Sequence, residues 1–347
     1  MKMFGLSVLI GILVIIGVFS WMSYPWSLGY QKNEFEVKVV EPKVDFESLE
    51  ESPSVIKILT WNLGFLYGKG SEGPGYLPRT KEFYEERLQG LVNQIREWGP
   101  DIICFQEIDF DSSRSGGIDQ AEYVAVHAGY PYIAEAVTWE ANYIPFPYWP
   151  LSRNFGRMKS GGAILSRFPI KTHELELLAK PAANPWWYNL FYLHRYFQKV
   201  VVDIGGKDYS VVNLHLEAFD KENRAEQARL LGKNFDFVAG DFNMVPDISA
   251  KKRKYPESED DYENDKTFGI MKSSGMAEVI PEEIYGKDEL RFFTFPSWAP
   301  NRRLDYIFFR KGLKMMRAEV LPSALSDHLP LRASFQISGP NFNPYQQ

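Results

Sequence analysis

The chain has 347 residues, of which 45% are hydrophobic and 24% charged, a balance that excludes a disordered protein. Its formal net charge of −6 disfavours a protein that binds nucleic acid through a uniformly basic surface, although net charge says nothing about one cleft. Because Cys104 is the single cysteine, a disulfide within the chain is excluded, and cysteine usage does not indicate a redox compartment.

The first predicted element is an apolar membrane segment. Residues 3–30 carry no charge, and residues 3–22 could cross a hydrocarbon core of roughly 30 Å as a helix. Lys2 precedes this run and acidic residues predominate after it, so the positive-inside rule predicts an extracytoplasmic main domain. We therefore expect residues 1–30 to anchor the protein in a membrane. The alternative is a cleaved signal peptide, after which the domain would be secreted, although the A-x-A cleavage pattern is absent.

Residues 31–54 are rich in Glu, Lys, Pro and Ser and are interpreted as a linker. One catalytic domain is expected over residues 55–338, followed by a tail at residues 339–347. The domain opens with a β-rich run at residues 55–59. An apolar stripe then predicts a helix that ends before Gly99 and Pro100, because its large apolar residues recur at spacings of three and four.

The remaining elements are mostly short apolar runs. Many strands with a few helices between them predict an α/β fold in which two sheets face each other and helices flank them. Strands are expected at residues 101–105, 162–165, 199–204, 210–216, 237–239, 304–309 and 331–337, and helices at residues 224–231 and 268–274.

Polar side chains recur within these strands or just after them. Burying a carboxylate costs several kcal/mol unless a metal ion or a partner compensates, so one such residue is usually explained by a structural hydrogen bond. Several together are better explained as a site for a hard cation and a phosphate, because Mg²⁺ prefers oxygen ligands and imidazoles handle protons. The residues are Asn62, Glu107, His215, Asp241, Asn243, Asp305, Asp327 and His328.

Six motifs in order resemble the signature blocks of the endonuclease/exonuclease/phosphatase superfamily, over residues 56–335. The resemblance implies a four-layer α/β sandwich of the deoxyribonuclease I-like type, with two facing, mainly antiparallel sheets flanked by helices. It also implies a hydrolase that needs Mg²⁺, or Mn²⁺ or Ca²⁺, to cleave a phosphoester. The motifs are Thr60-Trp61-Asn62, Gln106-Glu107, Asn213-Leu214-His215, Gly240-Asp241-Phe242-Asn243, Leu304-Asp305-Tyr306-Ile307 and Ser326-Asp327-His328-Leu329-Pro330.

The same resemblance implies a role for each residue. Glu107 would bind the cation, with Asn62 close to the metal and Asp327 supplying a water-mediated contact. His328 would be the general base or an electrostatic partner of the phosphate, oriented by Asp305 because a carboxylate on one ring nitrogen fixes the tautomer. Around the phosphate, Asp241 would position the attacking water and Asn243 would donate a hydrogen bond to a phosphate oxygen. His215 would stabilise the charge developing on phosphorus or help the leaving group.

Residues 130–197 are rich in aromatic side chains, and we expect Arg167, Trp186 and Trp187 to contact substrate. The preferred interpretation is a membrane-associated phosphodiesterase acting on phospholipid head groups, with aromatic loops in the interface. The alternative is an exported or anchored nuclease whose aromatic residues stack on bases. A third and less favoured hypothesis is a catalytically silent binding module. No obligate protein partner is evident from the sequence.

Overall fold

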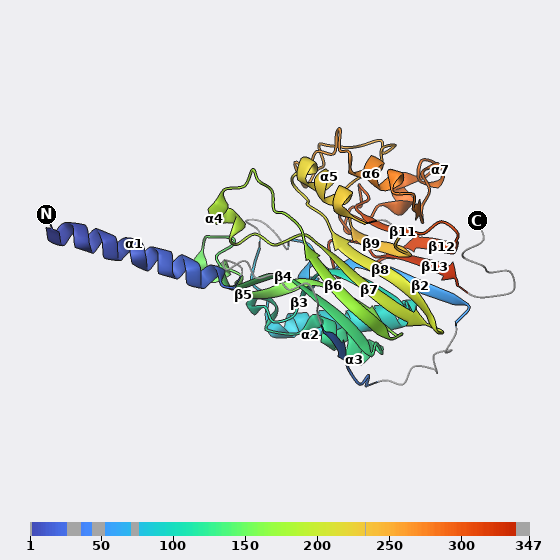
Figure 1. Cartoon of the computed structure of the whole chain (residues 1–347), viewed down its shortest axis with the longest axis horizontal. Coiled ribbons are helices and arrows are strands. Elements are labelled where there is room, and N and C mark those ends of the chain that lie inside the picture. Colours follow the sequence, from blue (N-terminus) through green and yellow to red (C-terminus); the bar gives the residue numbers. More distant parts are fainter. Residues whose placement is uncertain (1, 26–35, 44–52, 71–75, 233, 338–347) are drawn as a thin grey trace.

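The computed structural model describes residues 2–25, 36–43, 53–70, 76–232 and 234–337. Two sheets face each other in the middle of the molecule (Figure 1). The first sheet runs, in spatial order, through β1 (Val37–Val39), β4 (Tyr132–Ile144), β5 (Gly156–Ser166), β3 (Ile102–Asp109), β2 (Val55–Asn62), β13 (Leu331–Gln336) and β12 (Lys314–Val320). The second runs through β10 (Ala277–Glu278), β11 (Asp305–Phe309), β9 (Phe237–Asp241), β8 (Lys207–His215), β7 (Tyr196–Ile204) and β6 (Ile170–Leu177).

Helices cover the outer faces of both sheets (Figure 1). Those that cover the sheets are α2 (Lys81–Trp98) and α3 (Gln120–Ala128) on the first sheet and α5 (Lys221–Leu230) and α6 (Thr267–Ser273) on the second. In contrast, α1 (Lys2–Ser23) projects away from the sandwich (Figure 1), and α4 (Trp186–Asn189) and α7 (Glu282–Tyr285) are single turns in connections. Short 3₁₀ turns occur at Gly64–Leu66, Ser113–Ser115, Leu151–Arg153 and Glu289–Phe292.

Three apolar clusters hold the layers together. One lies between the sheets, where Ile58 and Ile102 of the first meet Val211 and Phe237 of the second. A second cluster joins the outer face of the first sheet to α2 and α3, and a third joins the outer face of the second sheet to α5 and α6. Side chains alternate along a strand, so each central strand contributes to two clusters. The predicted four-layer sandwich is confirmed.

Each sheet contains one parallel pair whose carboxyl ends form the same edge of the sandwich. β2 and β3 are parallel and joined through α2, and β8 and β9 are parallel and joined through α5. The other strand pairs among the described residues are antiparallel. We call this edge, where β2, β3, β8 and β9 end, the carboxyl edge.

Most predicted elements are confirmed. The helix predicted to end before Gly99 corresponds to α2. Thr80 caps its start by accepting a hydrogen bond from the backbone N–H of Phe83, and Gly99 ends it in the left-handed conformation. The structure adds β4, β6, β12 and α3, which the sequence patterns did not indicate. It also adds β1 to the sheet within the segment interpreted as a linker. Residues 26–35, residues 44–52 and the predicted tail lie outside the described residues.

Gly161 in β5 marks a position where the two longest strands approach too closely for a side chain. A Cβ added there would lie 1.8 Å from the backbone oxygen of Ala136 on β4. Gly161→Ala is therefore expected to lower the free energy of unfolding by about 3 kcal/mol, because backbone cannot move aside cheaply. The measurement is the thermal unfolding midpoint of the full chain in detergent. Gly269→Ala, with nothing within 4 Å of the added Cβ, is the control and should not lower it; equal melting of both variants would contradict the prediction.

Candidate active site

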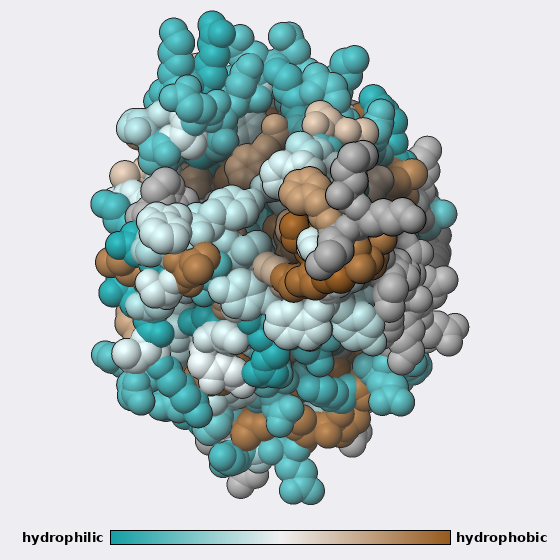
Figure 2. All heavy atoms as spheres, turned by 90° about the vertical axis from the view of Figure 1, so that its left-hand side faces the viewer, coloured by the Kyte–Doolittle hydropathy of each residue, from teal (hydrophilic) through white to brown (hydrophobic). Residues whose placement is uncertain are grey.

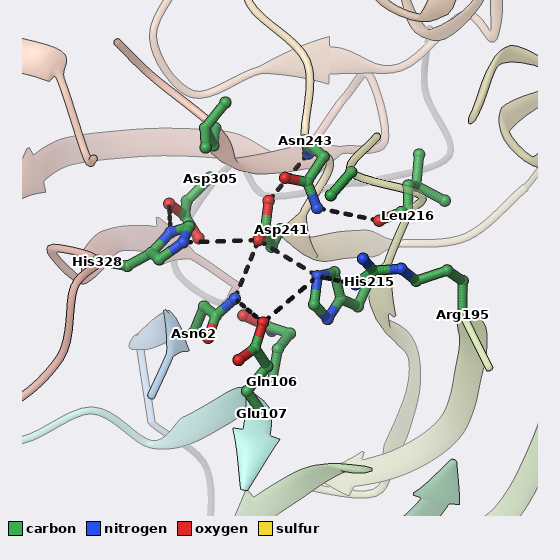
Figure 3. Close-up of polar contacts among 12 residues, drawn as sticks. Asn62, Gln106, Glu107, Arg195, His215, Leu216, Asp241, Asn243, Asp305 and His328 are labelled. Carbon is green, nitrogen blue, oxygen red and sulfur yellow. Dashed lines mark hydrogen bonds and ion pairs between the residues drawn. The ribbon is translucent and has the colours of Figure 1, made fainter. Parts of the chain in front are cut away.

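The predicted polar residues come together at the carboxyl edge (Figure 3). Asn62 ends β2 opposite Gln106 of β3, which places Glu107 beside it. On the facing sheet, His215 ends β8 opposite Asp241, which ends β9, and Asp241 in turn pairs with Asp305 at the start of β11. Strand order and register thus gather side chains that are far apart in the sequence.

Asn62 connects the two sheets through its amide. Its Nδ2 donates to Glu107 Oε1 at 3.1 Å and to Asp241 Oδ2 at 3.0 Å, and its Oδ1 accepts from the backbone N–H of Gly64 at 3.0 Å. Two carboxylates require the NH₂ group to face them, which fixes the orientation of the amide. In this arrangement Asn62 positions the carboxylates and does not turn its oxygen toward them, as direct metal ligation alongside Glu107 would require.

The carboxylates at the centre of the site lack the solvation that carboxylates normally have. Burial raises the pKa of Glu107, and the negative charge of Asp327 raises it further. Burial likewise raises the pKa of Asp241 to about 7. A divalent cation is the partner that would offset both effects, and carboxylate oxygens are the ligands that Mg²⁺ prefers. The residues present therefore fit such an ion.

A second grouping of possible ligands involves Asp241, Asp305 and His328, which bring one ligand atom each within 4.8 Å of one another. Asp305 Oδ2, however, lies 2.8 Å from His328 Nδ1 in a hydrogen bond. A ring nitrogen that carries the proton of this bond cannot also bind a metal. The bond leaves Nε2 of His328 open to a metal, so this grouping is a second position for a cation beside the one at Glu107.

His328 is held rigidly in place. Ser326 Oγ accepts from the His328 backbone N–H at 3.1 Å and donates to Asn62 O at 2.7 Å, while Trp61 Nε1 donates to His328 O at 3.0 Å. Burial opposes protonation of the ring, but the carboxylates of Asp305 and Asp241 outweigh it and raise the pKa of His328 to about 10. The free Nε2 lies 3.8 Å from Asp241 Oδ2, so it faces the centre of the site.

His215 stands in a different electrostatic environment. Its Nε2 lies 3.4 Å from Asp241 Oδ2 and 3.8 Å from Glu107 Oε1. Arg195, the residue that precedes β7, donates to the same nitrogen. Burial and the charge of Arg195 lower the pKa of His215 well below its usual value, so the ring is neutral at pH 7.

Arg195 is the site residue that the sequence did not reveal. Its side chain is buried, and its guanidinium lies 3.5 Å from Glu217, which accepts a hydrogen bond from Tyr192 OH at 2.8 Å. No motif includes it. The only sequence signal was an arginine directly before an apolar strand. Such an arginine lies beside the predicted site only if its strand runs antiparallel to the strand that ends in His215, as β7 does.

Two site residues have strained backbones. Glu107 and Asn243 both have φ of 50°, which costs a non-glycine residue of order 1–3 kcal/mol. The Asn243 backbone N–H donates to Asp241 Oδ1 at 2.9 Å, and its Nδ2 donates to Leu216 O at 3.0 Å. One N–H of the Asn243 side-chain amide thus links the end of β9 to the end of β8. The other N–H of this side chain is the one that could donate to a phosphate oxygen.

Asp327 lies next to the site. Its Oδ1 lies 3.1 Å from Ser326 Oγ, and a Cβ added to Gly64 would lie 2.5 Å from that oxygen. Gly64 therefore leaves room for the carboxylate. The negative charge of Asp327 also contributes to the raised pKa of Glu107. This arrangement is compatible with a water-mediated contact to a cation.

Arg167, which we expected to contact substrate, lies away from the polar site. Because β5 runs antiparallel to β3, Ser166 pairs with Ile102, five residues and roughly 16 Å before Glu107. Arg167 instead pairs with Asp101 at 3.3 Å at the opposite edge of the sheet. Trp186 and Trp187 lie in α4, in the segment that precedes β7, with 74% and 46% of their surface exposed. They lie at the carboxyl edge, but the structure records no contact between them and the polar site.

Comparisons with known proteins agree with this geometry. A family model described as "Endonuclease/Exonuclease/phosphatase family" matches residues 59–328. The exoribonuclease subunit Ccr4 of the CCR4-Not complex from Emericella nidulans is 33% identical over 98 residues, which cover 27% of this chain and 14% of that protein. The chain thus matches only a small part of that relative's length.

Solved structures share the fold. An endonuclease/exonuclease/phosphatase from Beutenbergia cavernae has a TM-score of 0.57 and 19% identity, covering 83% of this chain and 72% of its own. A mannosyl-6-phosphatase from Bacteroides thetaiotaomicron has a TM-score of 0.50 and 16% identity, covering 81% of this chain and 99% of its own. At such identities the likeness establishes the fold and leaves the substrate open.

Proposed function

Because the chain belongs to the endonuclease/exonuclease/phosphatase family, whose members hydrolyse phosphoester bonds, we propose that it is a Mg²⁺-dependent phosphodiesterase acting on lipid head groups at a membrane. The observation that carries the chemical part is the union of Asn62 and Glu107 with His215 and Asp241, brought from two sheets to one point. Buried carboxylates and histidines in such contact serve stability poorly, which favours a functional reason for them.

Glu107 would hold the cation directly, with Asp327 contacting it through water. When bound, the cation would supply positive charge to the phosphate oxygens. Mn²⁺ or Ca²⁺ could occupy the same oxygen ligands, and the choice among these ions is part of the proposal. Asn62 would keep Glu107 and Asp241 at a fixed separation, which pre-organises the site for a tetrahedral phosphate.

The protein's own residues would handle protons and charge around the phosphate. Asp241 would orient water for in-line attack on phosphorus, with the second N–H of Asn243 donating to a phosphate oxygen. The raised pKa keeps His328 protonated at pH 7, so its Nε2–H would donate to a phosphate oxygen while its Nδ1–H stays bonded to Asp305. Neutral His215, held by Arg195, would lie where charge develops on the leaving group.

The lipid substrate is supported by the N-terminal helix. Residues Phe4–Ser23 of α1 form one helix long and apolar enough to cross a membrane, with a mean hydropathy of 2.4 and with exposed residues from Phe4 to Trp21. A signal sequence has the same character, so a secreted enzyme remains the alternative for localisation. With a retained anchor, the charges flanking α1 favour a catalytic domain outside the cytoplasm. A nuclease is the second candidate, because the Ccr4 relative is an exoribonuclease.

The substrate test uses the full chain in mixed detergent–phospholipid micelles with Mg²⁺. We expect release of phosphorylated head groups from phosphatidylcholine or phosphatidylethanolamine, and little nicking of supercoiled plasmid or shortening of single-stranded RNA. Glu107→Gln serves as the inactive control. Rapid cleavage of plasmid or RNA without head-group release would refute the lipid substrate and establish the nuclease. Inactivity on all of them and on a chromogenic diester would support the silent binding module.

A further inference from the structure

The C-terminal end of α1 is fastened to the catalytic domain. The backbone N–H of Asn142 in β4 donates to Tyr24 O at 2.9 Å, and its Nδ2 donates to Trp21 O at 3.0 Å. Pro25 adds a bridge to Ala141. The last turn of α1 and the residues after it are therefore bonded directly to the last residues of β4, so α1 is not attached through a free linker at this point.

A chain of aromatic contacts extends this attachment sideways. Phe19 of α1 lies 5.6 Å from Phe191, whose backbone oxygen accepts from Trp139 Nε1 at 2.8 Å. Phe155 then contacts Trp139 at 6.1 Å and Phe146 at 5.3 Å, measured between ring centroids. These contacts join α1 to two segments, the β4–β5 connection and the segment that contains α4.

Both segments present large side chains to solvent, and we call these side chains the aromatic collar. Their exposed fractions are 51% for Tyr148, 79% for Trp149, 64% for Leu151, 74% for Trp186 and 46% for Trp187. Neither residues 141–152 nor residues 181–193 contain a charged side chain. Figure 2 views the molecule from the side on which α1 projects, where pale and brown side chains adjoin each other across the middle of the surface.

The collar lies at the carboxyl edge. Ile144 pairs with Gly156 beyond the point where Ser160 pairs with Asp109, so the β4–β5 connection extends past the end of β3. The α4 segment leads into β7, whose first residue pairs with His215. Residues from both sides of the collar thus lie on the same edge of the sandwich as the polar site.

We propose that the aromatic collar rests in the head-group region of the bilayer that α1 crosses, so that the carboxyl edge faces the membrane. Trp and Tyr favour this region because their rings are amphipathic, and uncharged segments avoid the cost of dehydrating a charge there. The depth also agrees. Phe19 lies four residues before the end of α1, about 6 Å along the helix, so its partner Phe191 is brought to the interface.

This inference rests on the membrane anchoring included in the proposed function, but it does not depend on catalysis. A second copy of the chain could instead cover an apolar surface. The absence of charge from both segments and their direct continuity with a helix of membrane-spanning character favour lipid as the occupant.

Single cysteines test the proposal in the full chain reconstituted into phosphatidylcholine nanodiscs. Cys104 is fully buried, so Trp149→Cys, Trp187→Cys and the control Met316→Cys each provide one reactive thiol for an environment-sensitive fluorophore. Met316 is 55% exposed and lies on β12 beside Met315, which pairs with Phe335 near the start of β2, away from the carboxyl edge. The unsubstituted protein is the control that measures how far the fluorophore labels Cys104 itself.

We expect blue-shifted emission at positions 149 and 187, with strong quenching by spin-labelled lipids and weak quenching by aqueous iodide. The reverse is expected at position 316. Iodide quenching at 149 and 187 equal to that at 316 would overturn the proposal. Protection from both quenchers would also overturn it, because protein would then cover the collar. Hydrolysis is measured separately with the unsubstituted protein, so failure of this inference is distinguishable from failure of the proposed enzyme.

Discussion

Glu107→Gln is expected to reduce metal-dependent hydrolysis of a small chromogenic phosphodiester by about 10³-fold or more, equivalent to about 4 kcal/mol of transition-state stabilisation. Glutamine preserves the shape of the side chain and can still accept from Asn62 Nδ2, so the substitution removes chiefly the negative charge that would hold the cation. The measurement is kcat/KM as a function of Mg²⁺ concentration.

The same substitution is not expected to destabilise the protein. Burial and Asp327 both disfavour the ionised form of Glu107, and removal of a buried, repelled charge generally leaves stability unchanged or raised. Glu176→Gln is the control, because Glu176 pairs with Lys199 on the surface of β6 and should affect neither property. Near-normal activity of Glu107→Gln at saturating Mg²⁺ would remove this residue from the metal site.

Asp305→Asn is expected to lower kcat by about 10³-fold, within the range seen when the carboxylate partner of a catalytic histidine becomes an amide. An amide NH₂ group placed against His328 Nδ1 would favour the wrong tautomer and would no longer stabilise a protonated ring. The measurement is single-turnover hydrolysis of the same diester.

Combination with His328→Ala provides the decisive readout. If Asp305 acts through His328, the double variant should be no slower than His328→Ala alone, because the two residues form one unit. Additive losses would mean that Asp305 has an independent role, for example as a metal ligand in the group with Asp241. Asp236→Asn is the control for stability, since this carboxylate pairs with Arg310 and accepts from Ser210 in the same sheet and should lower the melting temperature without changing kcat.

Much of the site could be predicted because its residues occupy strand ends that sequence patterns identify. Apolar runs before Asn62, Glu107 and Asp241 identify three strands near whose carboxyl ends these residues lie, and ordered motifs supply the rest. Arg167 shows the limit of this reasoning. Whether a basic residue next to a strand lies at the carboxyl edge depends on strand direction, and only the pairing of β5 with β3 reveals that it lies at the other end.

Elements were missed where side-chain patterns are ambiguous. β4 has polar and aromatic residues on a partly exposed face, and its burial pattern does not alternate regularly because two irregularities shift its register against β5. β1 has only three residues, and its Lys38 is held by Glu135 of β4 and by Asp119, contacts that no local pattern shows. Arg195 was missed for the same reason, since its importance comes from a histidine on the neighbouring strand.

The division of the site between two sheets has a consequence for how activity arises during biosynthesis. Asn62 and Glu107 belong to one sheet, His215 and Asp241 to the other, and the Asp305–His328 hydrogen bond itself crosses from β11 to the loop before β13. A chain in which either sheet has formed alone holds no complete catalytic group. Hydrolysis would begin only when the sheets dock, so the appearance of phosphoesterase activity during refolding would report that last assembly step, and a chain with undocked sheets would be inactive.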